Sequence, residues 1–274
     1  MSADNPASDS HPGAHPAAHY GGTDVAERVL ASLDPARIDR LAALDQFHVG
    51  GAAASRGLAE RAEIHEGQTI LDLGSGLGGP ARLLASEFGV DVTGIDLTPG
   101  FCRIAQELSV RSECSETTRF CAANALVLPF ADSSFDVIWT EHVAMNIGDR
   151  DALYRELLRV TRPGGVLALY DVVAGPDVAS LVYPVPWARE ASQSYLIDAD
   201  ALRRVVTEAG WTARHFHDES VAALNWLATA RPPKGVDGPT LRDVMGPDFL
   251  RMIANLRKNF GAGRLKAVQA VFEK

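Results

Sequence analysis

The chain has 274 residues, of which 46% are hydrophobic, enough to bury one large core. Its net charge of −9 disfavours non-specific attraction to nucleic acid or anionic lipid, so we expect a small-molecule partner, no nucleic acid and no membrane. Three cysteines without zinc spacing predict neither a disulfide framework nor a metal site. No apolar run reaches membrane-spanning length and no signal-peptide pattern opens the sequence, which predicts a cytoplasmic protein. The oligomeric state stays open.

The first 66 residues differ in character from the rest. Residues 1–19 are rich in Ala, Ser, Pro and His without hydrophobic periodicity, which predicts a disordered tail. Helical patterns follow at Val25–Leu44 and 52–62, with the paired glycines of LDQFHVGG between them. We therefore expect residues 20–66 to form a helical cap on a domain that spans residues 67–274.

From residue 67 onward, short apolar runs alternate with helical patterns, which is typical of a parallel sheet with crossover helices. The expected strands are Thr69–Leu73, Asp91–Ile95, Thr118–Ala122, Phe135–Thr140, Gly165–Tyr170, Trp211–Phe216 and Ala267–Glu273, and the expected helices are 80–88, 99–111, 150–160 and 198–209. A turn at 162–165 precedes the fifth strand, and a helical insertion at about 219–262 precedes the last. The pattern predicts a Rossmann-like α/β fold with a seven-stranded, mostly parallel sheet and helices on both faces.

The segment TILDLGSGLGGP (Thr69–Pro80) is a buried strand that runs into a glycine-rich turn. Glycines at such a turn let the backbone pass close to a ligand. Asp96 ends the next strand, 20 residues beyond Gly76, where a carboxylate can accept hydrogen bonds from both ribose hydroxyls. Alone, Asp96 could cap the following helix. Together, the turn and the acid predict a nucleoside site.

The D-x-G-x-G-x-G spacing of this turn resembles motif I of the class I S-adenosylmethionine (SAM)-dependent methyltransferases. AANALVLPFADSSFDVIWT and LLRVTRPGGVLAL resemble later motifs of that family, and the likeness covers about residues 45–215. It implies SAM as the cofactor. The implied contacts are Asp72, Gly74, Ser75 and Gly76 around the methionine half, Asp96 and Leu97 at the ribose, and Asn124 and Ala125 at the adenine. In many relatives an Asp stands where Asn124 lies.

A narrower likeness is to the glycine/sarcosine/dimethylglycine and phosphoethanolamine N-methyltransferases. FHVGGAAAS and the C-terminal LRKNFGAGRLKAVQAVFEK carry it. It implies that Tyr20, His48 and Glu141 belong to the SAM shell, although Glu141 could instead be a structural partner. The phosphoethanolamine enzymes use a Tyr–His pair, but here Val172 and Asn146 stand at those positions.

The segment Thr140–Asn146 follows the fourth strand, at the strand end where such sheets bind ligands. His142 could act as a general base, with Asn146 as a second catalytic residue. The alternative is a histidine that only hydrogen-bonds a backbone group or the cofactor. Trp187 could stack on a cationic amine and Arg189 could pair with a substrate carboxylate. An ordinary surface loop with Trp187 packed on the core is the alternative for that pair.

These patterns predict a SAM-dependent methyltransferase that acts on a small amine or an amino-acid-like acceptor. The alternatives are an O- or C-methyltransferase of a secondary metabolite, an NAD(P)-dependent oxidoreductase, and a non-catalytic SAM-binding protein. Methyl transfer from a sulfonium needs little beyond alignment of the nucleophile, so the lack of an obvious catalytic dyad does not exclude activity.

Overall fold

The computed structural model describes residues 29, 31, 45–229 and 239–274. The predicted tail at 1–19, Tyr20 and residues 230–238 of the predicted helical insertion lie outside the described residues. So do nearly all the residues of the helical pattern at 25–44. Within the described part of the chain, no helix is long and apolar enough to span a membrane.

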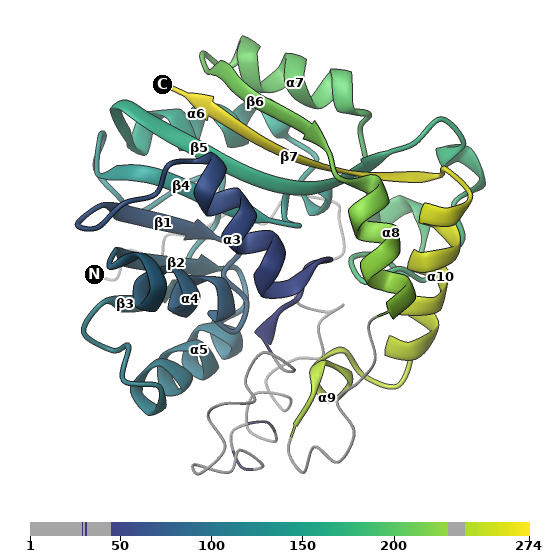
Figure 1. Cartoon of the computed structure of the whole chain (residues 1–274), viewed down its shortest axis with the longest axis horizontal. Coiled ribbons are helices and arrows are strands. Elements are labelled where there is room, and N and C mark those ends of the chain that lie inside the picture. The colour runs from purple at the N-terminus through teal and green to yellow at the C-terminus, as the bar shows by residue number, and fades with distance from the viewer. Residues whose placement is uncertain (1–28, 30, 32–44, 230–238) are drawn as a thin grey trace, which may run out of the picture.

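One seven-stranded sheet, with strand order β3-β2-β1-β4-β5-β7-β6, forms the centre of the molecule (Figure 1). The strands are β1 (Thr69–Leu73), β2 (Asp91–Asp96), β3 (Thr118–Ala122), β4 (Phe135–Glu141), β5 (Thr161–Ala174), β6 (Thr212–Asp218) and β7 (Leu265–Glu273). The first five pair in parallel, and β7 runs antiparallel to both β5 and β6. The predicted fold class is confirmed.

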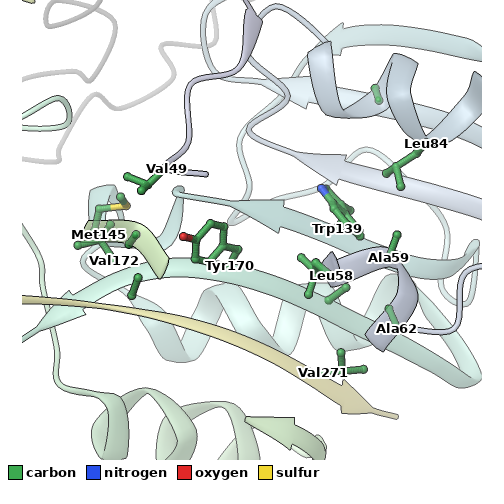
Figure 2. Packing of buried hydrophobic residues seen from close by; sticks show 14 of the residues in the cluster. Val49, Leu58, Ala59, Ala62, Leu84, Trp139, Met145, Tyr170, Val172 and Val271 are labelled. Atoms are coloured by element: carbon green, nitrogen blue, oxygen red, sulfur yellow. The ribbon is translucent and has the colours of Figure 1, made fainter. Parts of the chain in front are cut away.

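Helices cover both faces of the sheet because both faces of its central strands are apolar. The helices are α3 (Gly51–Arg61), α4 (Gly79–Phe88), α5 (Pro99–Arg111), α6 (Arg150–Val160), α7 (Ala199–Glu208), α8 (Ser220–Thr229), α9 (Leu241–Met245) and α10 (Phe249–Gly261). One core cluster joins α3, α4, α8 and α10 to the sheet, and a second joins α6 and α7 to it. In Figure 2, Val49, Met145 and Val172 gather with Tyr170 at one end of the first cluster.

Two details of the elements depend on their neighbours. Asp198 caps α7 as expected, because its side chain accepts a hydrogen bond from the backbone N–H of Ala201. The fifth strand, however, begins at Thr161 and not at Gly165. Thr161 pairs with Phe135 before the register shifts, so the predicted turn is an irregularity within β5, with Gly164 at φ 77°.

The order of the strands fixes where a ligand can bind. The chain moves outward from β1 to β2 and β3, then returns to place β4 on the other side of β1. The loops after β1 and β4 therefore lead to opposite faces of the sheet and leave a crevice between them at the carboxyl ends of the strands.

Candidate cofactor and acceptor pocket

A pocket lies at this crevice, between the loops that follow β1, β2 and β4. Thirteen residues predicted from the sequence line it: His48, Asp72, Gly74, Ser75, Gly76, Asp96, Leu97, Asn124, Ala125, Glu141, His142, Asn146 and Trp187. Arg189 is not among the lining residues, and Tyr20 is not described. Segments that are far apart in the sequence thus meet at one site.

The glycine turn is shaped by a close approach to the loop after β4. Gly74 has φ 70°, and a Cβ atom there would collide with the side chain of Val143. Only glycine meets both conditions without strain. The turn is fixed to β2 by two backbone donors: Ser75 N–H donates to the Ile95 carbonyl (2.9 Å), and Gly76 N–H donates to Asp96 Oδ2 (3.1 Å).

Asp72 and Ser75 present polar atoms to the pocket that the described residues leave unsatisfied. Asp72 is 2% exposed, and neither its Oδ2 nor Ser75 Oγ has a hydrogen-bond partner in the described part of the chain. Burial, followed by the charges of Glu141 and Asp96, raises the pKa of Asp72 well above its ordinary value. A buried acceptor of this kind is costly unless a ligand supplies a donor or a positive charge.

Both carboxylate oxygens of Asp96 accept hydrogen bonds from backbone N–H groups. Thr98 N–H donates to Oδ1 (2.8 Å) and Gly76 N–H to Oδ2 (3.1 Å). Burial raises the pKa of this carboxyl, against the opposing effect of those hydrogen bonds. Thr98 is the N-cap residue of α5, so Asp96 supports the start of that helix while it also lines the pocket.

Asn124 and Glu141 have protein partners. Leu126 N–H donates to Asn124 Oδ1 (3.0 Å), so the side-chain carbonyl expected to read the adenine already accepts one hydrogen bond. Glu141 accepts hydrogen bonds from Ser55 Oγ (3.0 Å) and Trp139 Nε1 (3.1 Å), and its Oε1 lies 3.5 Å from His48 Nε2. Glu141 therefore has the contacts of the structural partner that the sequence left open.

His142 occupies an unusual backbone conformation for a residue with a side chain. Its φ is 57°, and its N–H donates to the Tyr170 carbonyl (2.7 Å). The ring is buried, and neither ring nitrogen has a hydrogen-bond partner among the described residues. Burial, with a further contribution from His48, lowers the pKa of His142 well below its ordinary value. The imidazole is therefore neutral and free to bond to a ligand.

Asp171 and Arg150 stabilise the loop that carries His142. Burial raises the pKa of Asp171 to about 7, although the nearby Arg150 and the backbone N–H groups of Ala144 and Val143 lower it. Arg150 donates to the Ile147 carbonyl (2.9 Å) and to the Tyr195 carbonyl (2.9 Å). These contacts fix the 3-10 turn η3 (Ala144–Asn146) beneath the pocket.

The remaining walls of the pocket are apolar. They include Phe47, Val49, Met145, Ile147, Val172, Pro186, Trp187, Met245 and Leu256. Four carboxylates, Asp45, Asp72, Asp96 and Glu141, also line it, whereas no Lys or Arg does so within 45–229 and 239–274. Among the described residues, the pocket lining therefore has acidic side chains and no basic Lys or Arg side chain.

The two predicted acceptor residues have different environments. Trp187 is 5% exposed and lines the pocket, and its Nε1 donates to Ser194 Oγ (2.9 Å). Arg189 donates to Asp248 Oδ2 (2.9 Å) at the start of α10, and its side chain is 47% exposed. The expectation that Arg189 holds a substrate carboxylate is not supported, because this arginine faces solvent and already has a carboxylate partner.

Sequence reasoning missed the walls supplied by the C-terminal helices. Met245 of α9 and Leu256 of α10 line the pocket more than 100 residues after His142. No local pattern distinguishes these side chains from ordinary core residues. Asp45 also lines the pocket, although in the sequence it stands in LDQFHVGG beside paired glycines and no pattern marks it as a site residue.

Comparison with known proteins assigns the domain. Residues 71–169, which run from β1 to β5, match the family model described as a methyltransferase domain. The chain carries a class I SAM-dependent methyltransferase domain. SAM is the cofactor of this domain, and the unsatisfied Asp72 Oδ2 and Ser75 Oγ fit the ammonium group of its amino-acid half.

Relatives of the methyltransferase domain have varied substrates in their names. A 2-methyl-6-phytyl-1,4-hydroquinone methyltransferase from Synechocystis sp. is 35% identical over 56% of this chain and 42% of its own length. A 27-O-demethylrifamycin SV methyltransferase from Amycolatopsis mediterranei is 29% identical over 70% and 72%. A solved Haemonchus contortus phosphoethanolamine N-methyltransferase 2, in complex with SAM, has a TM-score of 0.68 at 19% identity, over 92% of this chain and 59% of that one. This chain spans 42% and 52% of the lengths of the first two curated relatives.

Proposed function

We propose that this protein transfers a methyl group from SAM to a small acceptor that is uncharged and largely apolar. The observation that carries the proposal is the composition of the pocket walls beyond the cofactor residues. They are formed by apolar side chains, and no Lys or Arg among the described residues lines the pocket. A phosphate or carboxylate placed there would be buried without a counter-charge, which costs several kcal/mol or more.

At the cofactor end of the pocket, we assign each residue to a part of SAM by the hydrogen bonds that its side chain can still form. Asp72 and Ser75 hold the amino-acid half of SAM, because their buried acceptors are unsatisfied by the described protein groups. Asp96 holds the ribose with the lone pairs that its two backbone donors leave free. Ala125 and Asn124 border the adenine.

The chemistry that SAM supplies when bound is an electrophilic methyl group on a sulfonium sulfur. The protein contributes position and proton transfer. His142 is neutral and its ring nitrogens are free, so it can take the proton from an acceptor hydroxyl as that oxygen attacks. Apolar walls exclude water, and Met145 and Trp187 orient the acceptor by contact.

A small amine without a carboxylate is the second candidate. Trp187 lines the pocket, and the face of its ring suits a cationic or partly cationic amine. The amino-acid-like acceptors predicted from the sequence need a cation for their carboxylate, and Arg189 is not placed to supply it. Amines without a carboxylate therefore remain candidate acceptors, while zwitterionic acceptors are disfavoured.

The proposal is tested with purified protein, methyl-labelled SAM and matched acceptor pairs. Each pair consists of a hydroquinone or phenol and the same compound bearing a phosphate or carboxylate. A tertiary alkylamine and an aromatic primary amine are tested as separate acceptors. We expect label in the uncharged phenol and at least about tenfold less in its anionic partner. Preferred methylation of the anionic member would refute the acceptor class, and SAM binding without transfer to any member would favour a non-catalytic binding protein.

A further inference from the structure

A short segment ahead of α3 covers one side of the cofactor end of the pocket. We call residues 45–50 the strap. Its members Asp45, Phe47, His48 and Val49 all line the pocket. The strap belongs to no strand of the sheet, so side-chain contacts must hold it in place.

One end of the strap is tied to the protein by a buried ion pair. Arg82 of α4 donates from Nη2 to Asp45 Oδ2, and the two side chains are 7% and 4% exposed. Arg82 Nη1 also donates to the Leu77 carbonyl (2.9 Å) and to the Ala105 carbonyl (3.3 Å). A single guanidinium therefore joins the strap, the glycine turn and α5.

The strap also lies directly on the glycine turn. A Cβ atom at Gly79 would collide with the Asp45 carbonyl oxygen and with its side chain, and one at Gly76 would lie 3.5 Å from the ring of Phe47. At the other end, His48 Nε2 contacts Ser55 Oγ (3.1 Å) and the Gly51 carbonyl (3.0 Å). The strap is thus fastened at both ends across the turn.

We propose that Arg82 is a positioning residue for the cofactor, which holds the strap closed through Asp45 and thereby slows release of the bound ligand. Arg82 does not line the pocket, so it acts through the strap and not by contact. A ligand beneath a fastened segment leaves only when the segment opens. Loss of the ion pair should therefore raise the dissociation rate. The inference goes beyond the proposed function because it does not depend on the acceptor.

The test uses S-adenosylhomocysteine as the probe and measures its association and dissociation rates by stopped-flow displacement. Asp45→Asn keeps the shape of the side chain and removes its charge. We expect it to raise the dissociation rate at least tenfold. Arg82→Lys, which keeps the charge but cannot bond to all three partners, should give an intermediate increase.

The matched control is Glu87→Gln. Glu87 of α4 also pairs with an arginine of the preceding segment, Arg56, but this pair is exposed and lies away from the pocket. We expect its dissociation rate to stay within twofold of the wild-type value. An Asp45→Asn rate that is also within twofold of wild type would overturn the proposal.

A second measurement on the wild-type protein covers the case in which Asp45→Asn fails to fold. Hydrogen exchange of the strap amides should slow at least tenfold when S-adenosylhomocysteine binds, and unchanged exchange would overturn the proposal. Failure of the wild type to bind this probe would overturn the cofactor assignment as well. The two failures are therefore distinguishable.

Discussion

The ring of His142 stands edge-on to the ring of Tyr170, with their centroids 4.7 Å apart and their planes at 70°. The backbone N–H of His142 donates to the carbonyl of that same tyrosine. Both contacts hold a left-handed residue in one orientation, so its imidazole lines the pocket instead of packing into the core. Such strain persists only where the surroundings fix it, and it is common at functional sites.

Replacing His142 tests its role as a general base. His142→Asn suits the test because asparagine tolerates a positive φ but does not accept a proton at neutral pH. Removal of a general base lowers turnover about 100-fold or more, and we expect S-adenosylhomocysteine affinity to stay within threefold. His65→Asn, at an exposed position away from the pocket, is the control. A loss of cofactor affinity with unchanged turnover would place His142 in the cofactor shell.

The lowered pKa of His142 also predicts how stability depends on pH. An unfolded histidine titrates near pH 6.5, whereas the folded protein resists protonation of this ring until lower pH. Below about pH 6.5 the unfolded state therefore binds the extra proton, and the free energy of unfolding decreases as the pH is lowered. Urea denaturation at pH 7.5 and 5.5 measures this loss. The loss should be smaller in His142→Asn, and an equal loss in both proteins would contradict the prediction.

Cofactor binding should release a proton from Asp72. Burial and the neighbouring charges of Glu141 and Asp96 raise its pKa in the free protein, and a cationic ligand beside it lowers that pKa again. SAM affinity should therefore rise with pH as Asp72 of the free protein loses its proton, at pH values below the α-amino pKa of about 8. Calorimetry in two buffers of different ionisation enthalpy counts the protons. Identical heats in both buffers would contradict the prediction, and Asp72→Asn should abolish the difference.

Asp96 should contribute strongly to cofactor affinity. Hydrogen bonds to a charged group are worth about 1.5–3 kcal/mol each, so Asp96→Ala, which removes two of them, should weaken SAM binding roughly 100-fold or more. Part of that loss comes from the glycine turn, since Asp96 also accepts from Gly76 N–H. Asp91→Ala, at the exposed start of the same strand, is the control. Unchanged affinity in Asp96→Ala would refute the placement of the ribose.

Met245 should limit the size of the acceptor. Its side chain lines the pocket from α9, so Met245→Ala should extend activity to bulkier acceptors, at a cost of about 2–5 kcal/mol in stability. Met252→Ala is a matched control because Met252 is equally buried but does not line the pocket. We expect similar destabilisation from Met252→Ala without a change in acceptor range. A parallel change in both variants would assign the effect to stability alone.

The parts of the site that the sequence predicted are those fixed by local geometry. Gly74, Gly76 and Asp96 follow buried strands whose register is set by apolar side chains, so their places at the crevice follow from the fold. His142 follows β4 in the same way, although nothing local reveals its left-handed backbone or its contact with Tyr170.

The parts that the sequence did not predict depend on packing between distant segments. Arg189 was expected at the substrate, but Asp248, 59 residues later, lies where it can accept its hydrogen bonds. Met245 and Leu256 become pocket walls only because the helices after β6 fold over the sheet. Side-chain type alone could not distinguish these outcomes.

A crystal structure of the protein with S-adenosylhomocysteine tests the central claim most directly. We expect the ribose hydroxyls at the Asp96 carboxylate, the amino group within hydrogen-bond distance of Asp72, and the sulfur facing a chamber bounded by His142, Trp187 and Met245. A ligand bound elsewhere would contradict the cofactor placement. A sulfur that faces a basic side chain would contradict the uncharged, apolar acceptor.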